Sequence, residues 1–424
     1  MAGDCATRSA PRASTRRWRP RVRSAALFTA LRLYHGYRLL WLGTVATQLG
    51  QWMQQIALGW YMLQLTDSAF WVGMIGFASG VPFLLIALPA GALIDRSDER
   101  KALIASQWGS MLVATGLALL ILTGLAEPWH LLVAAALNGT IMSINQMIRQ
   151  TFVPALVPRE HLANAVSLNS AAGNAMRIVG PSIAGIIIGL FGVAACFIVQ
   201  AAAVGSALLA TARIERPQRD GRAGGVPGGI LDGLREVRRH GAIAGLIVLT
   251  AIPAIFVFPY ITLMSVFARD VWEIGAGGLG ILMAASGTGA LSGALVAATM
   301  DRVRRKGLAV MATTVVYCLA VASFAASPHP ALGMVGLFLA GFTGSIFGSL
   351  SNTLLLLLAD PRLRGRIMSV YMLTNGFTPF GALAIGAAAE SLSAPKAVAF
   401  SCLIAATLTA LAATRMRQLR VTSG

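Results

Sequence analysis

Polar amide side chains recur inside apolar runs of this sequence, where they could form hydrogen bonds with a solute. Gln48, Gln51, Trp52 and Gln55 follow one another at three- and four-residue spacing, so a helix would place them on neighbouring faces. The other candidates for solute binding are Asn138, Asn145, Gln146, Asn174, Tyr260 and Asn375. Several amides on one cavity would suit a hydrogen-bonding solute, whereas a single buried amide more often links two helices.

Arg177 is a cation inside an apolar run, which is a costly position for a charge. It stands about 20 Å from the cytoplasmic end of its predicted helix, at about 1.5 Å per residue, which is past the midplane. No Asp, Glu or His lies well inside any apolar run, and acids such as Asp67 and Glu390 stand near the ends. We therefore expect Arg177 to meet an anionic or catecholate-like solute or a gating partner, with backbone carbonyls and water as the alternative.

The sequence shows no arrangement typical of catalysis, a metal site or a cofactor site. Its five histidines have no ligand spacing, and its four cysteines stand far apart. The phosphate-binding pattern Gly-x-x-x-x-Gly-Lys is missing from the sequence. We expect no cofactor, no metal and no enzymatic activity, and a membrane-bound enzyme is the weaker alternative.

Membrane helices must position these residues, because the chain is 56% hydrophobic and only 12% charged, with a mean hydropathy of +0.71. Its apolar runs are continuous rather than alternating, which indicates helices of membrane-spanning length. The twelve runs cover 38–65, 69–93, 101–124, 128–152, 163–190, 193–212, 241–267, 275–299, 307–326, 330–357, 366–390 and 395–414. The predicted fold class is an all-α integral membrane protein with twelve transmembrane helices in two pseudo-symmetric six-helix bundles.

The positions of Lys and Arg predict the orientation. With the N-terminus in the cytoplasm, all but three of the 34 Lys and Arg lie on the cytoplasmic side; Arg177 lies within a span, and Arg269 and Lys396 lie outside. Both termini are therefore predicted to be cytoplasmic. We attribute the net charge of +18 to topology and to contact with anionic lipid headgroups, and expect no nucleic-acid binding.

The two halves of the chain share a pattern. An Asp-Arg pair follows the second run of each half, Asp95-Arg96 and Asp301-Arg302, which indicates parallel repeats and alternating access. The predicted organisation is a basic disordered cytoplasmic tail over 1–37, a six-helix bundle over 38–212, a linker with an amphipathic segment over 213–240, a second six-helix bundle over 241–414 and a cytoplasmic tail over 415–424.

The loop after the second run resembles the signature loop of the major facilitator superfamily. It reads Gly91-x-Leu93-x-Asp95-Arg96-x-x-x-Arg100-Lys101, and Asp301-Arg302 is a degenerate copy. Other stretches are similar to the bacterial exporter branch that includes enterobactin-type siderophore exporters and macrolide efflux proteins. They are Arg149-Gln150 with Pro154, Arg177 with Gly180-Pro181, Phe267 to Val271, and Arg364-Gly365-Arg366. The likeness runs from about Arg38 to Arg415.

The resemblance implies a set of gating residues. They are Gly91, Asp95, Arg96, Arg100, Lys101, Arg149, Gly180, Pro181, Asp301, Arg302, Arg364 and Arg366. We expect Asp95 to cap a neighbouring helix and to pair with arginine in a cytoplasmic latch. For Gly180-Pro181, helix packing and a role in blocking leak are both open.

The function that the resemblance implies is secondary export by alternating access. The expected cargo is a siderophore or an amphipathic drug-like small molecule, and the expected location is a bacterial inner membrane, with the protein acting as a monomer. Proton antiport is the usual coupling in this family, but no Asp, Glu or His in the membrane centre supports it here. An importer of metabolites or sugars with the same fold is the alternative.

Overall fold

The structure consists of long helices. The computed structural model describes residues 28–87, 98–215, 235, 237–300, 305–360 and 363–415, and these include no strand. Ten of the helices described are long and apolar enough to cross a membrane. The ten coincide with ten of the twelve predicted runs. The other two runs correspond to α2 and to the pair α15 and α16.

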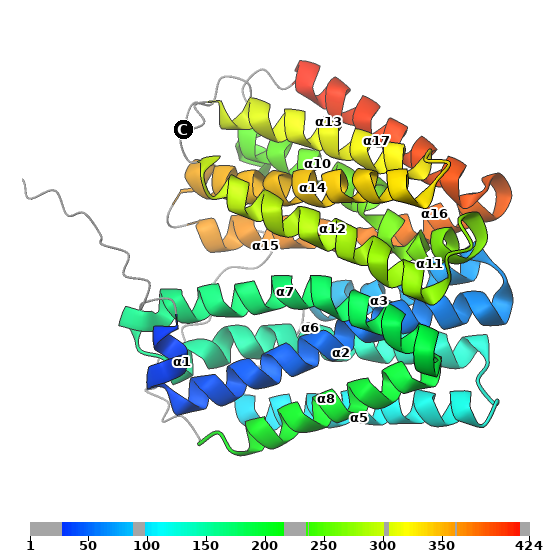
Figure 1. The fold of residues 1–424 in the computed structure, drawn as a ribbon. Helices are drawn as coiled ribbons and strands as arrows, with labels where there is room; N and C mark the ends of the chain where they lie inside the picture. The colour runs from blue at the N-terminus through cyan, green and yellow to red at the C-terminus, as the bar shows by residue number, and fades with distance from the viewer. Residues whose placement is uncertain are drawn as a thin grey trace, which may run out of the picture.

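The first half of the chain forms one group of packed helices. They are α1 (Thr29–Leu33), α2 (His35–Thr66), α3 (Ala69–Ala87), α5 (Glu99–Leu122), α6 (Pro128–Leu156), α7 (Arg159–Phe191) and α8 (Val193–Ala212). α2 packs against α7 and α8, α5 packs against α6 and α8, and α3 packs against α6 (Figure 1).

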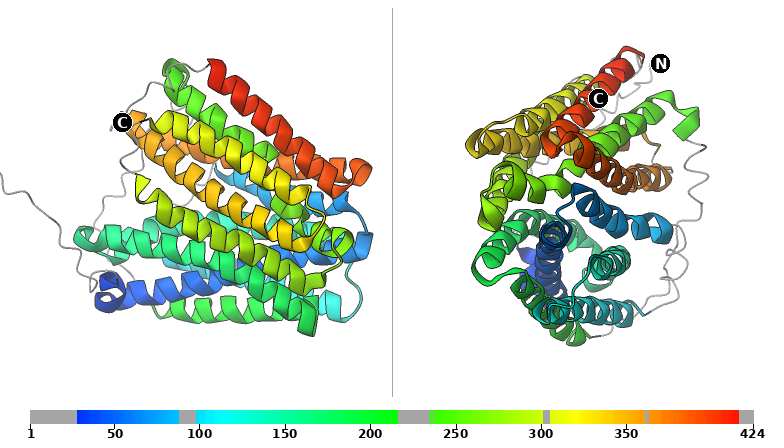
Figure 2. Two further views of the ribbon diagram at one scale, coloured as in Figure 1. Left: turned by 45° about the horizontal axis from the view of Figure 1, so that its top comes forward. Right: turned by 90° about the vertical axis from the view of Figure 1, so that its right-hand side faces the viewer.

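The second half forms a second group. Its elements are α10 (Gly241–Phe256), η2 (Phe258–Leu263), α11 (Met264–Val266), η3 (Phe267–Val271), α12 (Gly275–Ala297), α13 (Lys306–Ala325), α14 (Pro330–Leu358), α15 (Arg364–Asn375), α16 (Thr378–Leu392) and α17 (Ala394–Arg415). α14 packs against α12 and α13, and α13 also packs against α17. The two groups lie side by side in Figure 2, the first coloured blue to green and the second lime to red.

Two predicted helices are interrupted, which corrects the prediction of single helices over 241–267 and 366–390. Pro379 stands at the start of α16 and has no N–H to bond with the Asn375 carbonyl, so α15 ends there after 12 residues. In the run over 241–267, Pro253 and Pro259 likewise lack the backbone N–H that a continuous helix needs. Here α10 ends at Phe256 and is followed by the short elements η2, α11 and η3.

The predicted disordered tail over 1–37 is too long, because helical structure begins at Thr29. Two contacts with α7 hold this segment. The Ala30 N–H donates to Asn164 Oδ1 at 3.1 Å, and the Tyr37 hydroxyl donates to the Ala165 carbonyl at 2.8 Å. Long-range contacts of this kind leave no trace in local composition.

The two halves meet through α7 with α12 and through α3 with α16. We call the end of the molecule that holds His35 and Arg415 the termini end, and the end that holds Asp67 and Ser393 the turn end. α7 and α12 lie together near the turn end and separate toward the termini end (Figure 1). The halves therefore close the turn end of the molecule.

Glycines allow this close approach at the turn end. A Cβ at Gly185 of α7 would lie 2.6 Å from Gly280 Cα of α12, and a Cβ at Gly73 of α3 would lie 3.0 Å from Gly386 Cα of α16. Small residues on both partners let the helix backbones touch.

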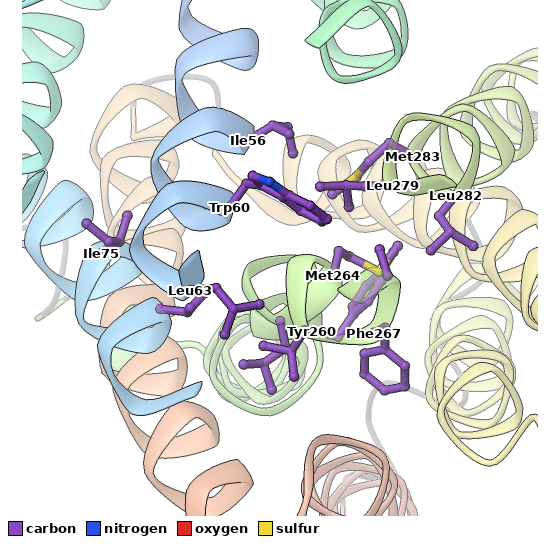
Figure 3. Close-up of a cluster of buried hydrophobic side chains, with 14 of the residues drawn as sticks. Ile56, Trp60, Leu63, Ile75, Tyr260, Met264, Phe267, Leu279, Leu282 and Met283 are labelled. Carbon is purple, nitrogen blue, oxygen red and sulfur yellow. The ribbon is translucent and has the colours of Figure 1, made fainter. Parts of the chain in front are cut away.

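A buried apolar cluster seals the same region (Figure 3). It joins Trp60 and Leu63 of α2 to Met264 and Phe267 of the second half, and Leu279 of α12 packs into it. Burial of this apolar surface across the two halves stabilises the closed turn end.

Candidate substrate cavity and its gates

A cavity of about 400 Å³ lies between the two halves. It is walled by α2, α3 and α6 from the first half and by η2, α11, α15 and α16 from the second. Its polar lining residues are Gln51, Gln55, Ser79, Asn138, Ser143, Gln146, Thr262, Ser265, Asn375 and Thr378. Every lining side chain among the described residues is neutral, so these residues offer amide and hydroxyl hydrogen bonds beside an apolar surface.

Five of the predicted solute-binding residues line this cavity, namely Gln51, Gln55, Asn138, Gln146 and Asn375. They come from α2, α6 and the end of α15, which the fold brings together from three distant parts of the chain. The other six lie outside the lining, namely Gln48, Trp52, Asn145, Asn174, Arg177 and Tyr260.

Most of the residues outside the lining pack against neighbouring helices. Asn145 is 3% exposed, and its Oδ1 accepts a hydrogen bond from Ser106 Oγ of α5 at 3.2 Å. Trp52 packs against Gly180 of α7, where a Cβ on the glycine would lie 2.6 Å from Trp52 Cβ. For these two residues the helix-linking alternative fits the observed contacts.

The serine and threonine hydroxyls of the lining were not among the predicted solute-binding residues, which were amides, aromatic residues and Arg177. Ser79 Oγ and Ser143 Oγ each donate to the carbonyl four residues earlier, at 2.7 and 2.8 Å. Their oxygen lone pairs remain available to a solute as acceptors. The four-residue spacing of Gly139 and Ser143, which places both on one face of a helix, could have pointed to Ser143, because both residues line the cavity.

Arg177 is exposed on α7, the helix of the first half that packs against α12 of the second. Tyr260 is 2% exposed, and its hydroxyl lies 3.3 Å from Ser286 Oγ. Within the described residues, Arg177 has no ion pair with a carboxylate. The expectation that it meets an anion stays a prediction.

Arg149 is a second base within a membrane-spanning helix, whereas Arg177 was the only base predicted inside a span. It lies in α6, seven residues before the helix ends at Leu156. Its guanidinium donates hydrogen bonds to the hydroxyls of Thr44 and Thr47 on α2, the latter at 3.3 Å. In the sequence it stands three residues before the end of the predicted run over 128–152, close enough to the cytoplasmic end to be counted with the cytoplasmic bases.

Arg269 of η3 fastens the two halves together at the turn end. Its guanidinium donates to the Leu63 carbonyl near the end of α2 and to the carboxylate of Asp67. A second carboxylate, Asp270, lies 3.5 Å from the same guanidinium. Asp67 ends α2 in the left-handed conformation, with φ of 48°, which aspartate tolerates better than most residues.

Glu390 of α16 binds two residues that follow Asp67, at the turn between α2 and α3. Its carboxylate accepts hydrogen bonds from Ser68 Oγ at 2.9 Å and from the Phe70 N–H at 3.2 Å. An anion at the start of α3 also interacts favourably with the dipole of that helix. The second half thus holds the α2–α3 turn with a cation on one side and an anion on the other. Neither Arg269 nor Glu390 was in the predicted gating set.

The signature loop is only partly within the described residues. Asp98 caps α5 by accepting hydrogen bonds from the backbone N–H groups of Arg100 and Lys101, at 3.0 and 3.3 Å. The Arg100 guanidinium donates to the carbonyls of Thr211 and Ala212 at the end of α8. Arg100 therefore ties α5 to α8 within the first half.

The remaining predicted gating residues give a mixed result. Gly91, Asp95, Arg96, Asp301 and Arg302 lie outside the described residues, as does the side chain of Arg366. Arg364 borders a smaller cavity of about 300 Å³ between α10, α14 and α15. Gly180 packs against α2, and Pro181 lies inside α7, so a role in blocking leak stays a prediction.

Residues 26–423 match the model of a protein family described as transmembrane secretion effector. The chain belongs to this family of the major facilitator superfamily. The predicted resemblance to the bacterial exporter branch is thereby confirmed.

Two curated relatives of this secretion-effector chain are named for siderophores. It is 32% identical to the staphyloferrin A transporter of Staphylococcus aureus (strain NCTC 8325 / PS 47) over 154 residues, which are 36% of this chain and 39% of the relative. It is 24% identical to the enterobactin exporter EntS of Escherichia coli (strain SMS-3-5 / SECEC) over 402 residues, which are 92% and 95% of the two chains.

Solved structures confirm the fold of this secretion-effector chain. A bacterial homologue of the human lysosomal transporter Spinster, inward-facing and occupied, superposes with a TM-score of 0.73 at 14% identity, covering 92% of this chain and 99% of that one. The nucleoside transporter NupG gives 0.70 at 16% identity over 91% and 98%. The predicted all-α major facilitator fold is confirmed, and the protein is a multi-pass membrane transporter, while the count of twelve crossings stays a prediction.

Proposed function

We propose that this transporter exports an amphipathic small molecule, a siderophore or a drug-like compound of similar size, by alternating access. The observation that carries the proposal is a cavity lined by both halves, next to a turn end held shut by Arg269 and Glu390. A cavity between two bodies that can separate at either end is what alternating access requires.

The orientation follows from the positions of the basic residues. We place the termini end in the cytoplasm of a bacterial cell, because the loops at that end hold nearly all of the Lys and Arg. In the described conformation the turn end, which would face outward, is closed. Cargo would then reach the cavity from the cytoplasm, and release would require the contacts of Arg269 and Glu390 to break.

The cavity suits a small amphipathic cargo. Its volume of about 400 Å³ lies within the range of small-molecule sites. Phe83 and Met142 supply an apolar surface, and the amides of Gln51, Gln55 and Asn138 supply hydrogen bonds. The siderophore names of the two curated relatives support this cargo class.

Proton antiport is the coupling that we propose. Asp67 and Glu390 are carboxylates whose contacts must break when the halves separate at the turn end. Protonation of either would weaken its contact with the opposite half. The carboxylates at this interface thus offer a link between protons and conformation.

Transport in membrane vesicles of known sidedness tests the proposal. Labelled catecholate siderophore and a labelled lipophilic cation are offered to everted and right-side-out vesicles with an imposed pH gradient. We expect everted vesicles that contain the protein to accumulate the siderophore more than protein-free vesicles do, and to lose this uptake when the gradient is collapsed. Uptake confined to right-side-out vesicles would contradict export and favour an importer. Uptake of the cation alone would favour drug efflux.

A further inference from the structure

The cavity-facing residues of α6 form a stripe that continues to Arg149. Asn138, Met142 and Gln146 line the cavity at four-residue spacing, and Arg149 follows Gln146 by three residues. Residues three and four apart share one face of a helix. Arg149 therefore lies one turn beyond the cavity lining, toward the termini end.

The facing stripe of α2 continues in the same direction. Gln55 and Gln51 line the cavity, Thr47 precedes Gln51 by four residues, and Thr44 precedes Thr47 by three. Both threonines accept hydrogen bonds from Arg149. The guanidinium thus lies where the two stripes meet, at the termini end of the cavity.

In the part of the chain that the structure describes, the charge of Arg149 is met by neutral groups only. The hydroxyls of Thr44 and Thr47 donate their own protons to the carbonyls of Leu40 and Gly43, at 2.8 and 2.7 Å. Among the described residues, no carboxylate forms an ion pair with Arg149. A partly buried cation without an anion is unfavourable, and two neutral acceptors leave guanidinium N–H donors free for a ligand.

We propose that Arg149 binds an anionic group of the solute, a carboxylate or a phenolate, at the termini end of the cavity. The inference rests on the proposed function in so far as this solute is the cargo. An acidic head on the guanidinium would leave the rest of the molecule among the amides and apolar side chains of the cavity. The fork of N–H donors favours a planar carboxylate, which can accept two parallel hydrogen bonds.

Binding of a matched pair of probes tests this site without transport. The probes are 2,3-dihydroxybenzoate and the neutral 2,3-dihydroxybenzamide, and binding is measured by equilibrium dialysis with purified protein in nanodiscs. We expect the wild type to bind the acid about tenfold more tightly than the amide, as one charge-assisted hydrogen bond allows. Arg149→Gln should abolish that preference, and Arg149→Lys should retain part of it. Arg38→Gln, which removes an exposed cation of α2 outside the cavity lining, should leave the preference unchanged.

Gln146→Glu gives a second test that keeps Arg149 in place. Its carboxylate, one turn away, would neutralise the guanidinium, so the preference for the acid should fall to about twofold or less. Equal binding of both probes by the wild type, or an undiminished preference in Arg149→Gln or Gln146→Glu, would overturn the proposal. A lower melting temperature of the ligand-free Arg149 variants with an unchanged preference would show a purely structural role and would also overturn it. A preserved preference in a protein that fails to export would contradict the proposed function and leave the anion site standing.

Discussion

Arg269 and Asp67 join the two halves of the molecule at the point where α2 ends. The guanidinium lies on η3 of the second half, and the carboxylate lies at the C-terminal end of a helix of the first half. Because Arg269 also donates to the Leu63 carbonyl, it compensates the negative end of the α2 dipole as well as the Asp67 charge. Because this contact joins the two halves, it must break before the turn end can open, and a substitution that removes it should favour opening.

Arg269→Gln is expected to open the turn end more often. The Asp67 side chain is 74% exposed, so the ion pair contributes less than about 1 kcal/mol, and the open population should rise about two- to fivefold. Ser265→Cys, a buried cavity position, reports opening through labelling by a membrane-impermeant maleimide added at the turn end. Asp270→Asn is the matched control, because Asp270 contacts Arg269 within the same half. Equal labelling in all three backgrounds would contradict the role of Arg269.

Glu390→Ala is expected to raise the same labelling. The substitution removes the acceptor for Ser68 Oγ and for the Phe70 N–H, whereas Glu390→Gln keeps one acceptor oxygen and should have a smaller effect. We expect a rise of roughly threefold for the alanine variant. A glutamine variant that labels faster than the alanine variant would argue against this order of effects.

Gly185→Ala is expected to block transport by keeping α7 and α12 apart. The added Cβ would lie 2.6 Å from Ala276 O and from Gly280 Cα, both backbone atoms that cannot move separately from their helix. Overpacking of this kind costs about 1–3 kcal/mol, enough to lower transport roughly tenfold or more. Gly189→Ala is a matched control one turn away, because its Cβ would be 3.7 Å from the nearest atom, Gly277 N. Similar transport rates in the two variants would refute the close contact.

Asp98→Ala is expected to destabilise the first half without closing the cavity. Loss of the cap on Arg100 N and Lys101 N should cost about 1 kcal/mol, seen as a lower melting temperature in nanodiscs. Lys101→Gln, which changes an exposed charge in the same turn and keeps the backbone N–H that Asp98 caps, should melt within about 1 °C of the wild type. A reversed order of the two melting temperatures would show that Asp98 is not the cap.

The sequence predicted the helices well because membrane spans are continuous apolar runs, and that signal is local. Which side chains of a helix face the cavity depends on how that helix packs against the others, and a local signal does not contain this information. Two residues adjacent in sequence illustrate the point. Asn145 bonds to Ser106 of α5, while Gln146 lines the cavity, although both are amides in the same run. The contact between Ser68 and Glu390 joins residues 322 positions apart and depends on the packing of α3 against α16.

Transport by variants of α2 in everted vesicles tests most directly whether cargo passes through this cavity. Gln51→Leu and Gln55→Leu remove amides from the lining, whereas Gln48→Leu changes an amide on the same helix that packs near Gly173 of α7. We predict that siderophore uptake falls at least about fivefold in each lining variant, as loss of one hydrogen bond to the cargo allows, and stays within about twofold of the wild type in Gln48→Leu. Full uptake by both lining variants, or an equal loss in all three, would contradict transport through this cavity.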